Sequence, residues 1–199
     1  MLSKLVHLRS LDASSCTFST LEHLPLVSKT LEHLSIANCS KLTLESLTVL
    51  SQLTGLTSLE MASLRNRAPF TLETSARLQG LSRLSNLRQL NLSRFSHPQG
   101  MPRGLLKGIS GMAALRELHL ANCSKEAEDS TRSHEAVASA ETSSTSSPLS
   151  LGGSDQELWF LEGLVQLQVL DLSGWRHAKA AALRGLSGLT ALTHLKLQR

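Results

Sequence analysis

One pattern of apolar residues recurs seven times along this chain. It reads leucine, two residues, leucine, one residue, apolar residue. The copies are Leu8-Leu11-Ala13, Leu31-Leu34-Ile36, Leu56-Leu59-Met61, Leu87-Leu90-Leu92, Leu115-Leu118-Leu120, Leu167-Leu170-Leu172 and Leu192-Leu195-Leu197. A unit repeated at near-regular intervals indicates modules that cannot bury their own apolar faces and therefore stack. The sequence predicts a solenoid of about seven repeats.

The intervals between copies predict where the stack is interrupted. Measured between first leucines they are 23, 25, 31, 28, 52 and 25 residues. All but the 52 lie in or near the range of a strand-plus-helix repeat, and 52 is close to two repeats. That interval therefore holds either a degraded repeat or an insertion. We favour an insertion, because residues 124–157 lose the leucine pattern and are rich in serine and threonine.

The domain organisation follows from this choice. We expect five repeats in residues 1–123 and two more repeats of the same solenoid in residues 158–199. Between them, residues 124–157 carry too little apolar surface to offset the entropy of ordering, so we predict an acidic, serine-rich, disordered insertion.

Each copy of the pattern predicts a short parallel strand, because alternate residues of a strand point to opposite faces of a sheet. Leu34 and Ile36 should point inward, and His33 and Ser35 outward. Ahead of the strands the leucines recur every third residue, as in Leu50-Leu53-Leu56, which is typical of a helix or a 3₁₀ turn. The predicted class is α/β: a curved solenoid with parallel strands on its concave face and helices or 3₁₀ turns on its convex face.

The amino-acid sequences of the repeats resemble those of a known family. Leu-Glu-His-Leu-Ser-Ile-Ala-Asn-Cys at 31–39 and Leu-Arg-Glu-Leu-His-Leu-Ala-Asn-Cys at 115–123 resemble leucine-rich repeat proteins. The continuation at 39–47 resembles their cysteine-containing subclass, which is known from intracellular proteins that include substrate-recognition subunits of ubiquitin ligases. The resemblance covers nearly the whole chain except about 124–157, and it implies a protein-binding role.

The three cysteines occupy one repeat position. Cys16, Cys39 and Cys123 each follow the second leucine of their pattern by five residues, where other repeats carry Leu64, Phe95 or Trp175. We expect all three to point inward as small hydrophobic residues. Neither Cys-x-x-Cys nor His-x₃-His occurs, so no zinc site is predicted. A disulfide between Cys16 and Cys39 is disfavoured in a reducing compartment.

Several function classes are disfavoured. No basic stretch followed by an apolar core and cleavage site opens the chain, and no apolar run reaches the roughly 18 residues that span a bilayer. We therefore expect a cytoplasmic protein, with the cytoskeleton, a ciliary axoneme or the nucleus as alternatives. Aromatic residues are only 3%, which disfavours nucleic-acid binding. The insertion has two basic and seven acidic residues and therefore a net charge of −5. Because the net charge of the whole chain is +4, the remaining residues carry +9. We expect these residues to attract an acidic partner or the insertion itself.

Catalysis is also disfavoured. His33, His119 and His194 fall on outward strand positions with no nucleophile at a fixed spacing, and no glycine motif matches a phosphate loop. We expect no enzyme activity, no cofactor and no metal. The sequon matches at Asn38, Asn91 and Asn122 lie at strand ends in a chain without a secretory signal, so we do not expect them to be glycosylated.

The outward strand positions are the best candidates for a binding site. They form three columns of mostly small and polar residues across the predicted sheet, and the candidates come from the first two columns. The candidate protein-binding residues are His33, Ser35, Glu60, Gln89, Asn91, Glu117, His119, Asp171 and Lys196. We expect a non-enzymatic scaffold that binds a protein partner through this face. The alternative is a fragment or adaptor module of a larger assembly, such as a ubiquitin-ligase substrate receptor or a ciliary or cytoskeletal complex. Uncapped terminal repeats could also self-associate.

Overall fold

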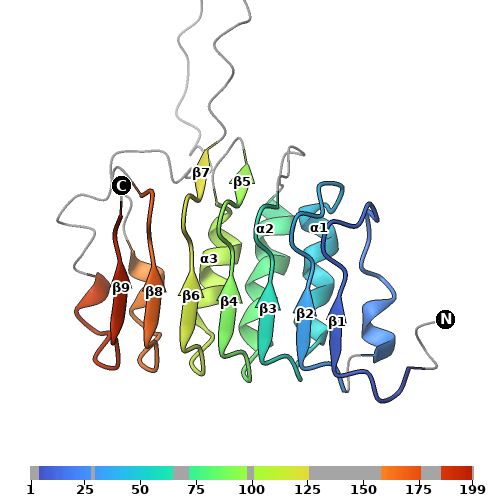
Figure 1. Ribbon diagram of the computed structural model, residues 1–199, viewed down its shortest axis with the longest axis horizontal. Coiled ribbons are helices and arrows are strands. Elements are labelled where there is room, and N and C mark those ends of the chain that lie inside the picture. Colours follow the sequence, from blue (N-terminus) through green and yellow to red (C-terminus); the bar gives the residue numbers. More distant parts are fainter. Residues whose placement is uncertain are drawn as a thin grey trace, which may run out of the picture.

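The computed structural model describes residues 5–27, 30–64, 72–97, 101–125, 158–175 and 185–198. Its main feature is one parallel sheet of seven three-residue strands, one from each copy of the pattern (Figure 1). The strands are β1 (Ser10–Asp12), β2 (His33–Ser35), β3 (Ser58–Glu60), β4 (Gln89–Asn91), β6 (Glu117–His119), β8 (Val169–Asp171) and β9 (His194–Lys196). The predicted stack of seven parallel strands is confirmed.

The strands follow one another across the sheet in chain order. β6 pairs directly with β8, with Glu117 opposite Val169, so the 52-residue interval places no strand between them. Two short strands lie beside the main sheet: β5 (Ser96–His97) and β7 (Ser124–Lys125), which pair in parallel. Ser124 and Lys125 are thus part of a strand, although we predicted disorder from residue 124. The rest of the predicted insertion, 126–157, lies outside the described residues.

Alternation along the strands separates the core from the surface as expected. The central leucine of each inner strand is at most 2% exposed, as are the apolar residues that end the same patterns; these are Leu34, Leu59, Leu90, Leu118, Leu170, Ile36, Met61, Leu92, Leu120 and Leu172. The two outer strands differ. Leu11 in β1 is half-buried and Leu195 in β9 is 40% exposed, because each has a neighbouring strand of this sheet on one side only among the described residues.

The second layer consists of helices and 3₁₀ turns that lie behind the sheet (Figure 1). Its α-helices are α1 (Leu44–Leu47), α2 (Leu72–Leu78) and α3 (Arg103–Ser110), and its 3₁₀ turns are η2 (Leu24–Val27), η3 (Thr48–Gln52), η4 (Gln79–Arg83) and η5 (Trp159–Leu161). The leucines that recur every third residue connect this layer to the strands, as the sequence predicts.

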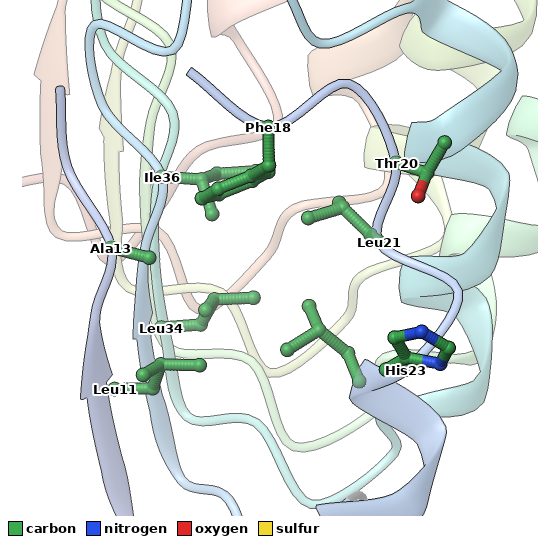
Figure 2. A pocket seen from close by; sticks show the side chains of 9 residues that line it. Leu11, Ala13, Phe18, Thr20, Leu21, His23, Leu34 and Ile36 are labelled. Atoms are coloured by element: carbon green, nitrogen blue, oxygen red, sulfur yellow. The ribbon is translucent and has the colours of Figure 1, made fainter. Parts of the chain in front are cut away.

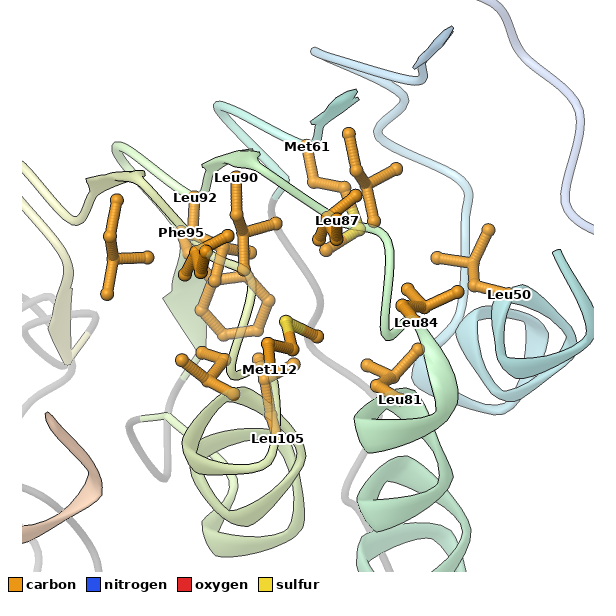
Figure 3. Packing of buried hydrophobic residues seen from close by; sticks show 14 of the residues in the cluster. Leu50, Met61, Leu81, Leu84, Leu87, Leu90, Leu92, Phe95, Leu105 and Met112 are labelled. Atoms are coloured by element: carbon orange, nitrogen blue, oxygen red, sulfur yellow. The ribbon is translucent and has the colours of Figure 1, made fainter. Parts of the chain in front are cut away.

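The core fills the space between the two layers. Figure 3 shows Leu81 and Leu84 on the helical side and Leu90 and Leu92 on the strand side, with the Phe95 ring between strand and helix. All five are at most 1% exposed. Burying one such side chain stabilises the fold by about 1.5–3 kcal/mol.

Glycine lets neighbouring repeats approach closely in the helical layer. A Cβ atom on Gly104 in α3 would lie 1.6 Å from the carbonyl oxygen of Ser75 in α2, and the Gly104 amide donates to the Ser75 hydroxyl at 3.0 Å. A Cβ on Gly163 would lie 2.7 Å from the Ser110 carbonyl oxygen. Glycine inside a helix is less favourable than alanine by roughly 1 kcal/mol per residue. The structure shows that these glycines admit the backbone of the preceding repeat.

The turns after β1, β2, β3, β4, β6 and β8 adopt the left-handed backbone conformation at one repeat position. Its φ angle is 56° to 60° in Ser15, Asn38, Ser63, Arg94 and Asn122. The equivalent Gly174 has φ 81°. Left-handed residues reverse the chain direction locally, and the cysteine position follows directly after each of them.

At the cysteine position, side chains donate hydrogen bonds to backbone carbonyl groups of the preceding repeat. The Cys39 thiol donates to the Ala13 carbonyl oxygen at 3.2 Å, and the Cys123 thiol donates to that of Leu92 at 3.1 Å. The Trp175 indole Nε1 donates to the Leu120 carbonyl oxygen at 2.8 Å. Burial raises the pKa of the Cys39 thiol, and it raises the pKa of Cys123 to about 12. These residues satisfy carbonyl groups next to the core as well as packing there.

The prediction that all three cysteines point inward is wrong for Cys16. Cys39 is buried and Cys123 is partly exposed, but Cys16 is exposed. Cys39 packs on β1 and Cys123 on β4, whereas among the described residues no repeat precedes β1 to cover Cys16. All three cysteines are free thiols.

Candidate binding face

The outward residues of the seven strands form two columns in register, which we call the concave face. In the first column His33 lies opposite Ser58, which lies opposite Gln89, and Gln89 lies opposite Glu117. The remaining members are Ser10, Val169 and His194. The second column consists of Asp12, Ser35, Glu60, Asn91, His119, Asp171 and Lys196. All nine candidate residues therefore lie on this face.

The candidate residues differ in how far they reach into solvent. His33 and Gln89 are exposed, and the Glu117 and Lys196 side chains are 38% and 54% exposed. Ser35, Glu60 and Asn91 are only partly exposed, and the Asp171 side chain is 13% exposed. The first column and the β9 end are thus more open to a partner than the middle of the second column.

Acidic and amide side chains of the second column bind their own backbone two residues later. Asp12 accepts a hydrogen bond from the Ser14 amide and Asp171 one from the Ser173 amide, both at 2.9 Å. Asn91 Oδ1 accepts from the Ser93 amide at 2.9 Å, and Glu60 accepts from the Ala62 amide at 3.2 Å. These side chains hold the turn that ends each strand.

The sequence carried a signal for this role. Asp-x-Ser at 12–14 and 171–173 and Asn-x-Ser at 91–93 share one repeat position, directly after the second leucine of the pattern. Side chains of Asp and Asn commonly accept a hydrogen bond from the backbone two residues on. The sequon match at Asn91 is therefore one instance of a turn motif.

Polar contacts also cross between strands of the concave face. The Asn91 side-chain amide donates to Glu60 Oε2 at 2.9 Å, and the hydroxyls of Ser14 and Ser35 lie 2.6 Å apart. Lys196 Nζ lies 3.9 Å from Asp171 Oδ2. These contacts link neighbouring repeats, and much of the second column is consequently engaged within the protein.

The local contacts act on two carboxyl groups. Hydrogen bonds from Ser14 lower the pKa of Asp12. Burial by itself raises the pKa of Asp171, but the hydrogen bonds from Ser173 and the charge of Lys196 outweigh it, so that the net pKa is lowered. Both groups are carboxylates at neutral pH and suit positively charged or hydrogen-bond-donating partners.

Sequence analysis missed a further column at the edge of the concave face. Each of its residues lies one position before a residue of the first column. From the second repeat on, the backbone amide of each member donates a hydrogen bond to the carbonyl oxygen of the equivalent residue in the preceding repeat. The members are Arg9, Glu32, Thr57, Arg88, Arg116, Gln168 and Thr193. Arg9 and Glu32 form an ion pair at 2.8 Å. Arg88 and Arg116 lie on adjacent rungs and are exposed. The position between the first two leucines of each pattern could have revealed this column.

Within the described residues no three His, Cys, Asp or Glu side chains gather in a way that could hold a metal ion. No described helix is both long enough and apolar enough to cross a membrane.

Comparisons with known proteins bear on the fold. No protein-family model and no curated protein sequence matches the chain. Among solved structures, an internalin (inlF) from Listeria monocytogenes matches with a TM-score of 0.61 at 16% identity, over 100% of this chain and 44% of the internalin. Internalin C2 from the same bacterium matches with a TM-score of 0.58 at 15% identity, over 99% of this chain and 74% of that one.

A plant protein gives a third match. The Arabidopsis receptor kinase HAESA, crystallised with the peptide hormone IDA and the co-receptor SERK1, has a TM-score of 0.53 at 18% identity, over 96% of this chain and 26% of that chain. This chain thus spans less than half of inlF and about a quarter of HAESA. The matched proteins are leucine-rich repeat proteins. Together with the seven in-register strands and the helical layer behind them, these likenesses show that the chain has the leucine-rich-repeat solenoid fold.

Proposed function

We propose that this chain is a non-enzymatic interaction scaffold whose concave face binds a protein or an extended peptide segment. The observation that carries the proposal is the in-register columns, which join seven strands into one continuous, mostly polar face. Parallel strands lie about 4.8 Å apart, so the face is roughly 30 Å across. Such a face is suited to many hydrogen bonds with an elongated partner.

We place the main contacts on the central patch, which consists of Arg88, Gln89, Arg116, Glu117 and His119. These residues come from adjacent rungs of β4 and β6 and are exposed or partly exposed. Arginine is enriched among the residues that dominate binding energy at interfaces. Because Arg88 and Arg116 stand side by side, we expect the partner to present carboxylates there.

The fold supports a peptide as one form of partner. HAESA, which shares this fold at 18% identity, was crystallised with a peptide hormone. An extended peptide running across the rungs would meet a new pair of outward side chains about every 4.8 Å.

The first experiment reverses charge on the two arginines. We compare Arg88→Glu/Arg116→Glu with Arg83→Glu/Arg103→Glu, whose arginines are exposed on the helical layer. Both variants change the net charge equally. Affinity purification with quantitative mass spectrometry should show partners that wild type and the helical-layer variant retain and that the concave variant loses by at least about tenfold.

A second pair of variants tests the face without relying on charge. Gln89→Trp places a bulky side chain on the concave face, and Gln79→Trp places the same side chain on exposed η4. If only Gln89→Trp loses partners, the concave face is still the binding site, but the proposal that the partner presents carboxylates to Arg88 and Arg116 is wrong. Unchanged partners with both concave variants would contradict the proposal. Ubiquitin-ligase subunits or axonemal proteins among the lost partners would identify the alternative, an adaptor within a larger assembly.

Self-association through the β9 end is a second candidate, favoured by its exposed apolar residues. Leu195 is 40% exposed and Leu197 is 48% exposed. Sedimentation velocity should show concentration-dependent dimers that Leu195→Lys/Leu197→Lys removes. Wild type that sediments as a monomer at every concentration would contradict this candidate.

We also propose a reducing, intracellular location. Its support is that Cys39 and Cys123 use their thiol hydrogens to bind carbonyl groups, because oxidation of either sulfur would remove the donor. Alkylation of proteins directly in lysing cells, followed by mass spectrometry, should recover both cysteines in the thiol form.

A further inference from the structure

A cavity of about 240 Å³ that is partly open to solvent lies behind β1 and β2 (Figure 2). Leu11 and Ala13 border it from β1 and its turn, and Leu34 from β2. Leu21 borders it from the segment that leads into η2. Because Leu34 points inward, the cavity and the concave face lie on opposite sides of the strands.

One residue of the repeat pattern accounts for much of this space. The last apolar position of the pattern holds a large residue in every other repeat, namely Ile36, Met61, Leu92, Leu120, Leu172 and Leu197, but it holds Ala13 in the first. The side chain that packs behind the neighbouring strands is therefore cut back to one methyl group beside Ile36. Replacing a buried leucine by alanine leaves a cavity wherever the surroundings do not collapse.

The opposite wall explains why the surroundings have not closed. α1, α2 and α3 follow β2, β3 and β4 along the chain, but after β1 residues 17–23 run without a helix and only the short turn η2 follows. Leu21 and Leu24 are fixed in the core, at 4% and 5% exposed. Both leucines line the cavity and leave its volume unfilled.

The chemistry of the walls specifies the kind of ligand. Seven of the nine lining residues are aliphatic or aromatic, and the two polar ones, Thr20 and His23, are exposed. For comparison, a fully enclosed apolar cavity of about 150 Å³ holds benzene or xenon. A charged ligand would lose its hydration without a buried partner to replace it.

We propose that this cavity is a binding site for a small neutral apolar molecule, of the size of one aromatic ring or a short branched alkyl chain. The site is independent of the concave face, and it extends the role of the chain beyond binding a protein.

Toluene serves as the probe, and binding is followed by methyl shifts in ¹³C–¹H correlation spectra of the full chain. We expect shifts at Ala13, Leu34 and Ile36 that saturate with toluene, and a rise in Tm of about 3–6 °C at tenfold excess over Kd. The filling variant Ala13→Leu should lose both effects and have a higher Tm without ligand. The control Ala76→Leu adds the same side chain on the exposed face of α2 and should bind as wild type does.

Two results would overturn the proposal. One is the absence of saturable shifts in wild type, which would leave the cavity to the apolar side chain of a macromolecular partner. The other is equal binding by wild type and Ala13→Leu, which would place toluene elsewhere. If Ala13→Leu does not fold, Ala13→Val is the substitute, and at least a severalfold loss of toluene affinity is required of it. The partner-capture experiments on the concave face do not depend on any of these outcomes.

Discussion

The first repeat and the central repeats carry the same leucine pattern but are packed differently. Around β3, β4 and β6 the pattern residues are at most 1% exposed, a helix or turn closes each repeat from behind, and glycines bring helices together. Around β1 the equivalent leucine is half-buried, the last apolar residue is Ala13, the cysteine is exposed, and a cavity remains.

The difference shows what a repeat obtains from its neighbours. A central repeat is covered on both sides, whereas in the described residues the first is covered only by the second. In a stack whose stability is a sum of repeat and nearest-neighbour terms, the first repeat therefore gains less from the same residues.

Thiol reactivity should separate the two regions most strongly. Only the thiolate reacts with iodoacetamide, and a pKa of about 12 leaves Cys123 almost entirely protonated at pH 8. We expect exposed Cys16 to be alkylated on the order of 10³-fold faster than Cys123, as measured by peptide mass spectrometry. Similar rates in the native protein, together with equal rates in guanidinium chloride, would mean that the Cys123 position is open.

Close helix packing should make one glycine of the central region indispensable. Gly104→Ala places a Cβ 1.6 Å from the Ser75 carbonyl oxygen, so we expect about 3 kcal/mol or more of destabilisation in urea unfolding. Gly80→Ala is the matched control, because its Cβ would lie 3.4 Å from the nearest atom, Ser51 Cβ. That variant should stay within about 1 kcal/mol of wild type. Equal effects would show that the helices are free to separate.

Truncating the same leucine in the two regions measures the contrast directly. Leu90 is 1% exposed and Leu11 is half-buried beside the cavity. We expect Leu90→Ala to cost about 3 kcal/mol and Leu11→Ala about 1 kcal/mol, measured by chemical unfolding. A larger loss at Leu11 would mean that the first repeat is packed as tightly as the centre.

The smallest effect concerns Asp12 and Asp171, which hold equivalent turns at opposite ends. Both native pKa values are below the ordinary 3.8, so each carboxylate stabilises the fold above that pH. The contribution disappears as the pH falls below 3.8 through the lowered native pKa. Urea unfolding should show that Asp171→Asn costs more than Asp12→Asn at pH 7, since only Asp171 is paired with Lys196. If Asp171→Asn lowers the free energy of unfolding by the same amount at pH 2 as at pH 7, the loss comes from packing and not from the carboxylate charge.

Much of the binding face could be predicted from the sequence. Strand alternation has a period of two, and repeats align in register, so the columns through Gln89 and Asn91 could be written down without a structure. The backbone hydrogen bonds of Asp171 and Glu60 could not, because they depend on the turn that follows the strand. The arginine pair Arg88 and Arg116 was missed because it stands outside the alternating part of the pattern.

The leucine spacing was enough to predict the repeat, the seven strands and the side of the sheet on which each residue lies, because it allows one way to bury the apolar residues. How completely each repeat is covered depends instead on its tertiary neighbours. Cys16 and Cys39 occupy the same position in the pattern, yet one is exposed and the other buried, because burial depends on the neighbouring repeat. The same holds for the cavity at Ala13, where the short side chain leaves a space that Leu21 and Leu24 line but do not fill.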